Sequence, residues 1–393
     1  MPRVKTACLL VALACACGEK ELVKGPADTP KEPIAMTEAS KAPLGGLPAP
    51  PISEATTPAS PAQIAAGDYH TCARMSDATV RCWGRNREGQ LGDGTTADKT
   101  NPTIVPGLHD VTAVTGGASY TCALTLARTV VCWGTGDLVG RGGSSTFLVP
   151  TAVPFLADVA EIDAGGLLIC ARTGAGAVHC WGTEKPPPGG GPAERLAVAA
   201  GAVQISAGEA HACARMDSGK VRCWGDGSWS ETAPRSFAHP ALAGNALDVS
   251  TGDSVACATI PGGLVQCWGR NEQGELGVAP DMDPHDVPVT LPKLAGVTSV
   301  VAGEAHLCAI LGDMTARCWG SDTDGELGRD LRSGSERPGP LGDLREIAEI
   351  TLGADHGCAR TTHAEVACWG SNGNGQLGDG TKERRMRPTR VAF

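Results

Sequence analysis

The chain is poor in aromatic and charged side chains. Only 4% of its 393 residues are aromatic and 19% are charged. Acidic residues outnumber basic ones by 43 to 33, so the basic surface that contact with a phosphate backbone requires is missing, and we expect no nucleic-acid partner. The longest early apolar run, Cys8–Cys17, has ten residues, about half of what a membrane-spanning helix needs. We therefore expect no transmembrane helix.

The N-terminus has the pattern of an export signal. A short basic segment with Arg3 and Lys5 precedes an apolar run of small residues. The following LACACG segment resembles the lipobox of bacterial lipoproteins, in which a cysteine is lipidated after cleavage. We predict that residues 1–17 form a lipoprotein-type signal peptide with Cys17 as the lipidated mature N-terminus. Cys15 is a second candidate, and an ordinary secretion signal or a cytosolic N-terminus are the alternatives.

Residues 18–61 are rich in proline and alanine and show no sustained period of 2 or 3.6 residues. Such a segment buries too little apolar surface to offset the entropy of ordering. We expect a disordered linker that tethers the anchor to a folded module.

The remaining residues, 62–393, are built from a repeat. The pattern Cys-x9-Cys-Trp-Gly occurs seven times, with successive first cysteines 43 to 51 residues apart. The pairs are Cys72 and Cys82, Cys122 and Cys132, Cys170 and Cys180, Cys213 and Cys223, Cys257 and Cys267, Cys308 and Cys318, and Cys358 and Cys368. Seven of the eight tryptophans follow the second cysteine of a pair.

Each repeat reads as four short strands separated by turns. In the second copy these are 102–105, 110–115, 120–124 and 130–133. Helical periodicity is absent, which argues against an α-solenoid, and a parallel β-helix would need shorter coils. Seven such units predict an all-β fold, a seven-bladed β-propeller of four-stranded blades.

The cysteine spacing fits a hairpin in which the two cysteines face each other. If Cys72 faces Cys82, the loop is 76–78, and three-residue loops favour a left-handed third residue. Glycine occupies that third position in three copies, as Gly176, Gly219 and Gly263. The pair then falls on a non-hydrogen-bonded site, where the Cα atoms are close enough for a disulfide. We predict one disulfide per blade, and hence an oxidising compartment; zinc binding and buried reduced thiols are the alternatives.

Four repeats continue into a glycine-rich stretch, such as 84–95 (GRNREGQLGDGT) and 370–381 (GSNGNGQLGDGT). With Ala-Gly-x-x-His-x-Cys-Ala upstream, this resembles the regulator of chromosome condensation repeat family over 62–393, here in a bacterial secreted or lipoprotein form. The resemblance implies a seven-bladed propeller, and we expect the two chain ends to complete a shared blade. The eponymous member is a nuclear nucleotide-exchange factor, a setting that disagrees with an export signal. Secreted bacterial propellers of this repeat type, one kind of which inhibits β-lactamases, are closer in setting.

Residues that suggest chemistry also have structural explanations. His70, His211, His306 and His356 share one repeat position, but Tyr120, Leu168 and Val255 occupy it elsewhere, so we expect packing rather than catalysis or metal binding. The 322–326 segment suggests a calcium loop but aligns with the glycine-rich turn of other blades, and the acidic 281–286 insert reads as a solvated loop. No catalytic motif is present. We therefore predict no enzyme, metal or cofactor.

The sequence thus predicts an extracytoplasmic binding module, either lipid-anchored in the cell envelope or secreted, and monomeric. Its partner would be a protein or polysaccharide of the envelope or exterior, with membrane contact only through the anchor. The alternatives are a hydrolase or lyase in the central channel, or a GTPase-regulator-like activity by family analogy. The loops of blades two to four lose the glycine-rich motif and gather non-repeat aromatics. The candidate binding residues are Phe147, Phe155, Trp229 and Phe237.

Overall fold

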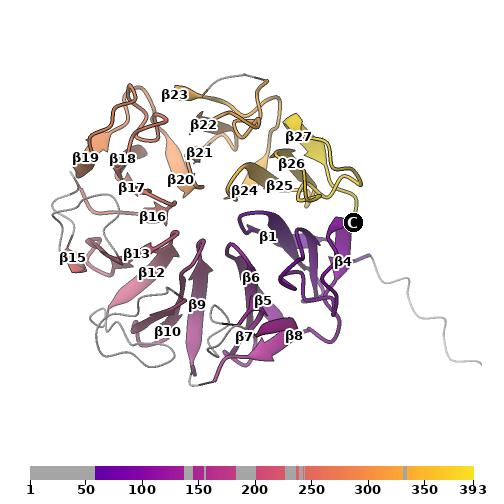
Figure 1. The fold of residues 1–393 in the computed structure, drawn as a ribbon. Helices are drawn as coiled ribbons and strands as arrows, with labels where there is room; N and C mark the ends of the chain where they lie inside the picture. The colour runs from indigo at the N-terminus through magenta and orange to yellow at the C-terminus, as the bar shows by residue number, and fades with distance from the viewer. Residues whose placement is uncertain are drawn as a thin grey trace, which may run out of the picture. The chain divides into compact units, whose positions relative to one another are not determined.

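The computed structural model describes residues 58–136, 145–154, 156–182, 201–225, 236–238, 242, 244–330 and 334–393. Within these ranges all regular secondary structure is β, and none of the described residues belongs to a helix that could cross a membrane. The strands form seven antiparallel sheets, the blades, arranged in a ring (Figure 1), and a channel runs between the innermost strands. Six blades have four strands, and the third has three within the described residues. The predicted seven-bladed propeller is confirmed.

Each blade is continuous in the chain, and its strands follow one another outward from the channel. The innermost strands are β1 (Pro61–Ala66), β5 (Val111–Gly116), β9 (Val159–Ala164), β12 (Ala202–Ala207), β16 (Asp248–Thr251), β20 (Val297–Ala302) and β24 (Ile347–Leu352). The second strands are β2 (His70–Met75), β6 (Tyr120–Thr125), β10 (Ile169–Thr173), β13 (His211–Met216), β17 (Val255–Ile260), β21 (His306–Leu311) and β25 (His356–Thr361).

The third strands carry the Cys-Trp pair, and the fourth strands lie at the rim of the ring. The third strands are β3 (Val80–Gly84), β7 (Val130–Thr135), β11 (Val178–Trp181), β14 (Val221–Gly225), β18 (Leu264–Gly269), β22 (Ala316–Gly320) and β26 (Val366–Gly370). The fourth strands are β4 (Lys99–Ile104), β8 (Thr146–Ala152), β15 (Ser236–Ala238), β19 (His285–Thr290), β23 (Ser335–Pro340) and β27 (Arg385–Arg390).

The hairpin between the second and third strands has the predicted geometry. In every blade the third loop residue has positive φ, whether it is glycine, as Gly176 (78°), or not, as Ala78 (62°) and Arg128 (61°). This conformation sets the register, so that Cys72 pairs with Cys82 across the two strands and the equivalent cysteines of the other blades pair in the same way.

All seven predicted disulfides are present, one in each blade. They join Cys72 to Cys82, Cys122 to Cys132, Cys170 to Cys180, Cys213 to Cys223, Cys257 to Cys267, Cys308 to Cys318, and Cys358 to Cys368. Their Cα–Cα distances are 4.0–4.1 Å. The alternatives of zinc binding and reduced thiols are therefore not realised at these fourteen cysteines.

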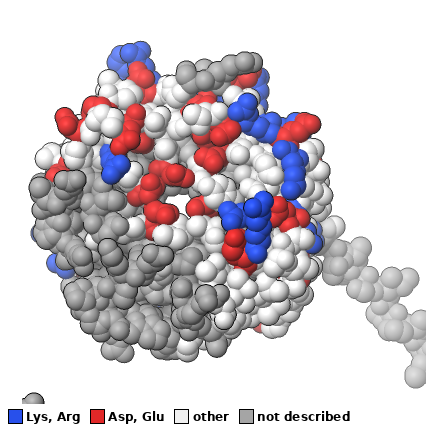
Figure 2. Space-filling model, viewed as in Figure 1, with Lys and Arg blue, Asp and Glu red and all other residues white. Residues whose placement is uncertain are grey.

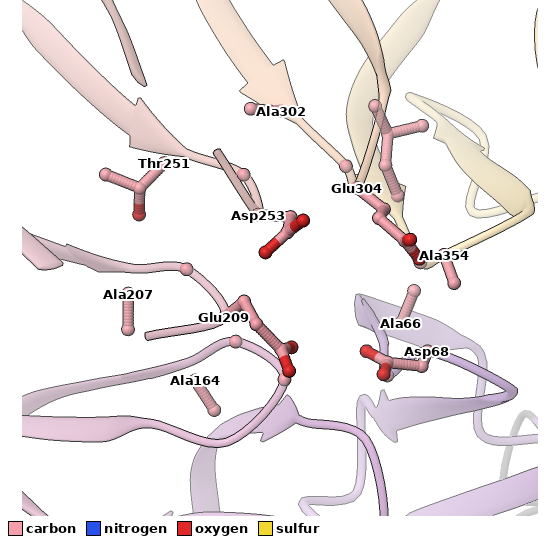
Figure 3. Close-up of a pocket in the computed structure, with 18 of the residues that line it drawn as sticks. Ala66, Asp68, Ala164, Ala207, Glu209, Thr251, Asp253, Ala302, Glu304 and Ala354 are labelled. Carbon is pink, nitrogen blue, oxygen red and sulfur yellow. The ribbon is translucent and has the colours of Figure 1, made fainter. Parts of the chain in front are cut away.

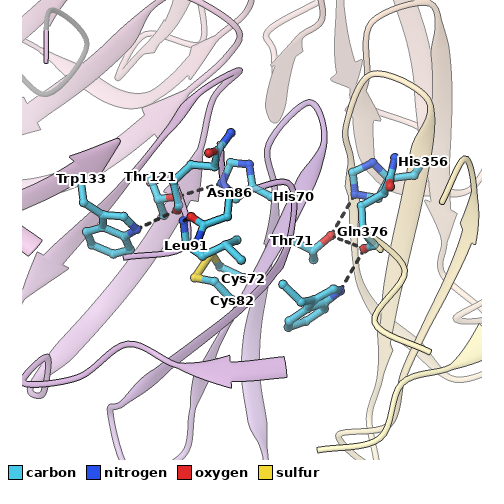
Figure 4. Close-up of a disulfide and its surroundings, with 12 residues drawn as sticks. His70, Thr71, Cys72, Cys82, Asn86, Leu91, Thr121, Trp133, His356 and Gln376 are labelled. Carbon is cyan, nitrogen blue, oxygen red and sulfur yellow. Dashed lines mark hydrogen bonds between the residues drawn. A yellow bond between two sulfur atoms is a disulfide. The ribbon is translucent and has the colours of Figure 1, made fainter. Parts of the chain in front are cut away.

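The tryptophan after the second cysteine joins each blade to the one before it. Trp133 of blade two packs on the core of blade one, and its Nε1–H donates to the Gln90 carbonyl oxygen at 2.8 Å (Figure 4). The same carbonyl accepts the Thr121 hydroxyl at 2.7 Å. Leu91, the next residue of the glycine-rich turn, is fully buried in the same cluster. The turn therefore supplies both a buried apolar side chain and a hydrogen-bond acceptor to the neighbouring blade.

The ring closes by the same contacts and shares no strand between the chain ends. The first sheet, β1-β2-β3-β4, and the last, β24-β25-β26-β27, are each complete from one continuous segment. Trp83 donates to the Gln376 carbonyl oxygen at 2.9 Å, and Thr71 donates to it as well. The expectation of a shared blade is wrong, because the outer strand pairs with the cysteine hairpin that precedes it, as Cys82 pairs with Thr103.

Candidate functional site

A ring of glycines forms one mouth of the channel. The glycine of the Ala-Gly-x-x-His pattern follows each innermost strand, and a Cβ placed on it would press against the carbonyl oxygen of the equivalent glycine in the next blade. The ring runs through Gly67, Gly117, Gly165, Gly208, Gly252, Gly303 and Gly353 and returns to Gly67. We call these seven residues the glycine collar. Backbone hydrogen bonds tie neighbouring turns together, such as Ala118 N–H to the Gly166 oxygen at 2.9 Å.

Below the collar, side chains tie one innermost strand to the next. Within the described part of the chain, no further strand lies on the channel side of these innermost strands. Backbone N–H groups of an innermost strand instead donate hydrogen bonds to polar side chains of the preceding blade. The N–H groups of Ala207, Ala302 and Ala66 donate to the side-chain oxygens of Asp163 (2.9 Å), Ser250 (3.0 Å) and Thr351 (2.8 Å), respectively. The channel between the strands holds a cavity of about 190 Å³. A smaller one of about 70 Å³ lies at the collar.

Four acidic residues surround the collar. They occupy the position after the collar glycine, as Asp68, Glu209, Asp253 and Glu304, and we call these four residues the acidic mouth. Figure 2 shows acidic side chains gathered around the central opening, and in Figure 3 the four carboxylates surround a common space. The other three blades have small residues at this position, namely Ala118, Gly166 and Ala354.

The electrostatics of the mouth disfavour full ionisation. Burial, and then the charges of Glu209, Glu304, Asp253 and Asp355, raise the pKa of Asp68 from 3.8 to about 7. Burial, and then the charges of Asp355 and Asp253, also raise the pKa of Glu304. Deeper in the channel, burial raises the pKa of Asp163 to about 7, although the Ala207 N–H bond opposes this. Near neutral pH the site thus changes its charge.

The four repeat histidines lie beneath the collar and are fully buried. His70 Nε2 contacts the Thr121 hydroxyl at 2.8 Å, and His356 Nε2 contacts that of Thr71 at 2.9 Å (Figure 4). Burial lowers the pKa of His70, His211 and His356 to about 3 and that of His306 to about 4. The imidazoles are therefore neutral, and the contacts of His70 and His356 join neighbouring blades, as expected for packing residues.

The two acidic loops of the sequence analysis are turns held by hydrogen bonds. In blade six, Asp322 accepts the Leu327 N–H at 2.9 Å and Glu326 accepts the Asp324 N–H at 2.7 Å. Asp324 and Glu326 come within 4.8 Å of Asp355, and Arg384 pairs with Asp324 at 3.3 Å. In the 281–286 insert, Asp281 pairs with His285 at 3.0 Å.

The predicted binding aromatics lie only partly within the described residues. Phe155 and Trp229 lie outside them, as do the loops 137–144, 183–200 and 226–235 and the lipidation candidate Cys17. Phe147 is partly buried in β8 and packs against the core of blades two and three. Phe237 lies on β15, for which only the backbone is described. The binding role of these four residues stays a prediction.

The acidic mouth was not among the sites predicted from the sequence. The available signal was a repeat position, the residue after the collar glycine, that is acidic in four of seven copies. Those four residues are far apart in the chain, and only ring closure brings them together.

Models of one repeat family match the chain in several places. A regulator of chromosome condensation (RCC1) repeat model matches residues 77–124, 262–310 and 365–393. A second model of the same repeat matches 62–90, 202–228 and 347–376.

The curated relatives match over short segments. The ultraviolet-B receptor UVR8 of Arabidopsis thaliana is 40% identical over 87 residues, which are 21% of this chain and 20% of the receptor. The probable E3 ubiquitin-protein ligase HERC4 of Homo sapiens is 37% identical over 75 residues, 18% of this chain and 7% of the ligase. The chain thus spans a fifth or less of the length of these relatives.

Solved structures match over about four fifths of the chain. Prp20p of Saccharomyces cerevisiae superposes with a TM-score of 0.69 at 21% identity, over 80% of this chain and 85% of that one. Human WBSCR16 gives a TM-score of 0.71 at 20% identity, over 80% and 95%. At this level of identity the likeness concerns the fold.

Proposed function

The chain belongs to the regulator of chromosome condensation repeat family, and we propose that it is an extracytoplasmic protein-binding module that engages its partner with the face around the acidic mouth. Yeast RCC1 (Prp20), a structural neighbour with RCC1 repeats, was crystallised bound to Kap60 and was characterised for its binding to Gsp1p and histones. This supports a protein rather than a polysaccharide partner. The ring would serve as a rigid platform, and side chains on its loops would recognise the partner.

The size of the cavities carries this proposal. Pockets for small molecules typically enclose about 300–1,000 Å³. The channel cavities, at about 70 and 190 Å³, are smaller than that. A broad face with a narrow charged opening therefore suits contact with a macromolecular surface better than enclosure of a metabolite.

Export to an oxidising compartment is supported by the seven disulfides and by the N-terminal pattern. We propose that Cys17 carries the lipid anchor. The wild-type protein should partition into detergent, whereas a Cys17→Ser variant should be processed abnormally and leave the membrane fraction. Unchanged processing and fractionation of Cys17→Ser would assign the anchor to Cys15 or remove it.

The contact region is proposed to include the loops of blades two to four, with Trp229 as an anchor, because buried aromatic residues often dominate binding energy. The test is chemical cross-linking in the native envelope, followed by purification of the protein and identification of the captured partner. Trp229→Ala should weaken capture by about 2 kcal/mol and leave the melting temperature nearly unchanged. Intact capture with intact stability would move the contact to another part of the ring.

A channel-located hydrolase or lyase is the second candidate, because the mouth does bring carboxylates together. Burial raises the pKa of Asp68 to about 7, within the range of a general acid. Incubation with peptidoglycan and polysaccharides separates the two functions. Turnover that is abolished by Asp68→Asn would establish an enzyme. Binding without turnover would establish a binding module.

A further inference from the structure

The acidic mouth presents a converging set of carboxylates. They reach the opening from four different blades, and the collar glycines hold their backbones in mutual contact. Small residues in the other three blades leave room for them. The Glu209 carboxylate lies in the space beside Gly166, where a Cβ on that glycine would overlap it. The set therefore lies on a backbone that has little freedom to spread.

The Asp68 side chain gives an independent indication of a ligand. It is mostly buried and points into the mouth (Figure 3), and no described side chain or backbone group donates a hydrogen bond to its carboxylate. Arg85, the cation that lies over the Tyr69 ring, pairs with Glu88 at 2.7 Å instead. Burying a carboxylate without a donor or counter-charge is costly. This points to a positively charged ligand.

The dimensions favour an organic cation over a bare metal ion. The cavity of about 70 Å³ corresponds to roughly two water molecules, which suits an ammonium or guanidinium head group. Among the described residues, carboxylates close enough to share one ion are found at Asp324, Glu326 and Asp355 and not at the mouth. A lysine head group offers three hydrogen-bond donors and an arginine five, enough to serve several carboxylates at once.

We propose that the acidic mouth seats a lysine or arginine side chain presented by a protein partner. This inference rests on the proposed function and specifies its chemistry: the partner carries a protruding basic residue that enters the channel opening. The four carboxylates supply charge-assisted hydrogen bonds to the head group of that residue.

The test uses a fluorescein-labelled hexalysine peptide, with hexa(acetyl-lysine) as the uncharged probe. Binding to the full-length protein is followed by fluorescence anisotropy at low salt and pH 8. Glu209→Gln/Asp253→Asn should weaken hexalysine binding at least tenfold. The matched control, Asp283→Asn/Asp286→Asn, removes the same number of charges from exposed positions at the outer edge of blade five and should change the affinity less than twofold. Equal melting temperatures verify that both variants fold.

The pH dependence gives a second readout. Burial and the charges of Glu209, Glu304, Asp253 and Asp355 raise the pKa of Asp68 to about 7, and Arg85 lies over the ring of the neighbouring Tyr69. Binding of hexalysine should therefore strengthen from pH 6 to pH 8. An affinity that is flat across this interval would contradict the assignment of Asp68 to the site.

Further results would overturn the inference. Equal weakening by the mouth and control variants would show binding to net charge alone. Displacement of hexalysine by micromolar Ca²⁺ but not by Mg²⁺ would show a metal site. If the mouth variant still cross-links its native envelope partner like wild type, the inference fails and the proposed function stands. If the wild-type protein itself gives no specific cross-linked partner, the proposed function is wrong.

Discussion

Asn86 anchors the glycine-rich loop of blade one, and replacing it with aspartate isolates the energy of that anchor. Its Oδ1 accepts the Leu91 N–H at 2.9 Å. Its Nδ2 lies 3.1–3.2 Å from four acceptors, which belong to Asp93, Thr95 and Ala97. The side chain is fully buried. Asn86→Asp keeps the shape and the acceptor but replaces the donor with a negative oxygen.

The expected loss follows from the donors removed. The NH₂ group supplies two hydrogen bonds, and each buried acceptor left without a donor costs about 1–3 kcal/mol. We expect Asn86→Asp to lower the free energy of unfolding by about 3 kcal/mol at pH 8. Asp322 occupies the same repeat position in blade six, and burial raises its pKa to about 6, while its Oδ2 has no hydrogen-bond partner among the described residues. The carboxyl group that replaces the Asn86 amide should behave in the same way.

The pH dependence distinguishes this mechanism from general damage. A raised folded pKa means that the folded state binds the proton more tightly than the unfolded state. The stability that this gives is complete below about pH 4, the pKa of an unfolded aspartate, and is lost as the pH rises through about 6. Guanidinium denaturation, followed by tryptophan fluorescence, should give a smaller deficit at pH 5 than at pH 8. The control Asn101→Asp, on the exposed rim strand β4, should change stability by less than about 0.5 kcal/mol. Equal deficits at both pH values would refute the reasoning.

Three more predictions concern the scaffold. Replacing both Cys122 and Cys132 with alanine opens a loop with a sequence separation of 10 and should cost about 2.7 kcal/mol of stability by the chain-entropy relation, measured by denaturant unfolding; an unchanged midpoint would contradict this. Gly208→Ala should lower the melting temperature strongly, because its Cβ would overlap the Gly252 carbonyl oxygen, whereas Gly373→Ala, which meets nothing within 4 Å, should not. Burial raises the pKa of Asp163 from 3.8 to about 7, so the folded protein is most stable below pH 4 with respect to this group and loses stability as the pH rises toward 7. Asp163→Asn should therefore raise the melting temperature at pH 8 and leave it unchanged at pH 4, and an identical shift at both values would count against the argument.

Local features could be predicted from the sequence because they are decided over a few residues. The disulfide pairing follows from a hairpin whose ends lie only ten residues apart. Glycine at the third loop position of three copies indicated a left-handed conformation there. Non-glycine residues adopt the same conformation in the other copies, such as Met314 (φ 59°). The turn at 325–328 was assigned by alignment with its sister blades, and Leu327 is indeed buried there.

Features that depend on how the repeats meet could not be predicted in the same way. Pro388 and Pro102 lie in similar segments, which suggested that the chain ends share a blade. That similarity does not reveal whether an outer strand pairs with the hairpin before it or after it. The acidic mouth forms because all seven innermost turns face one opening. The sequence spacing between Asp68 and Glu304 does not predict that their side chains lie close together. The interblade role of Trp133 likewise appears only once the Gln90 carbonyl lies beside it.

The glycine collar has a mechanical consequence. Because each glycine contacts the carbonyl oxygen of the next and the series returns to its start, the collar is a closed hoop. The diameter of the opening cannot increase at one blade without separating at least one pair of backbones, and the backbone hydrogen bonds between turns resist that. Widening would require all seven blades to move outward in concert. The opening should therefore keep a constant width, so that anything entering it is selected by fit and charge and not admitted by gating.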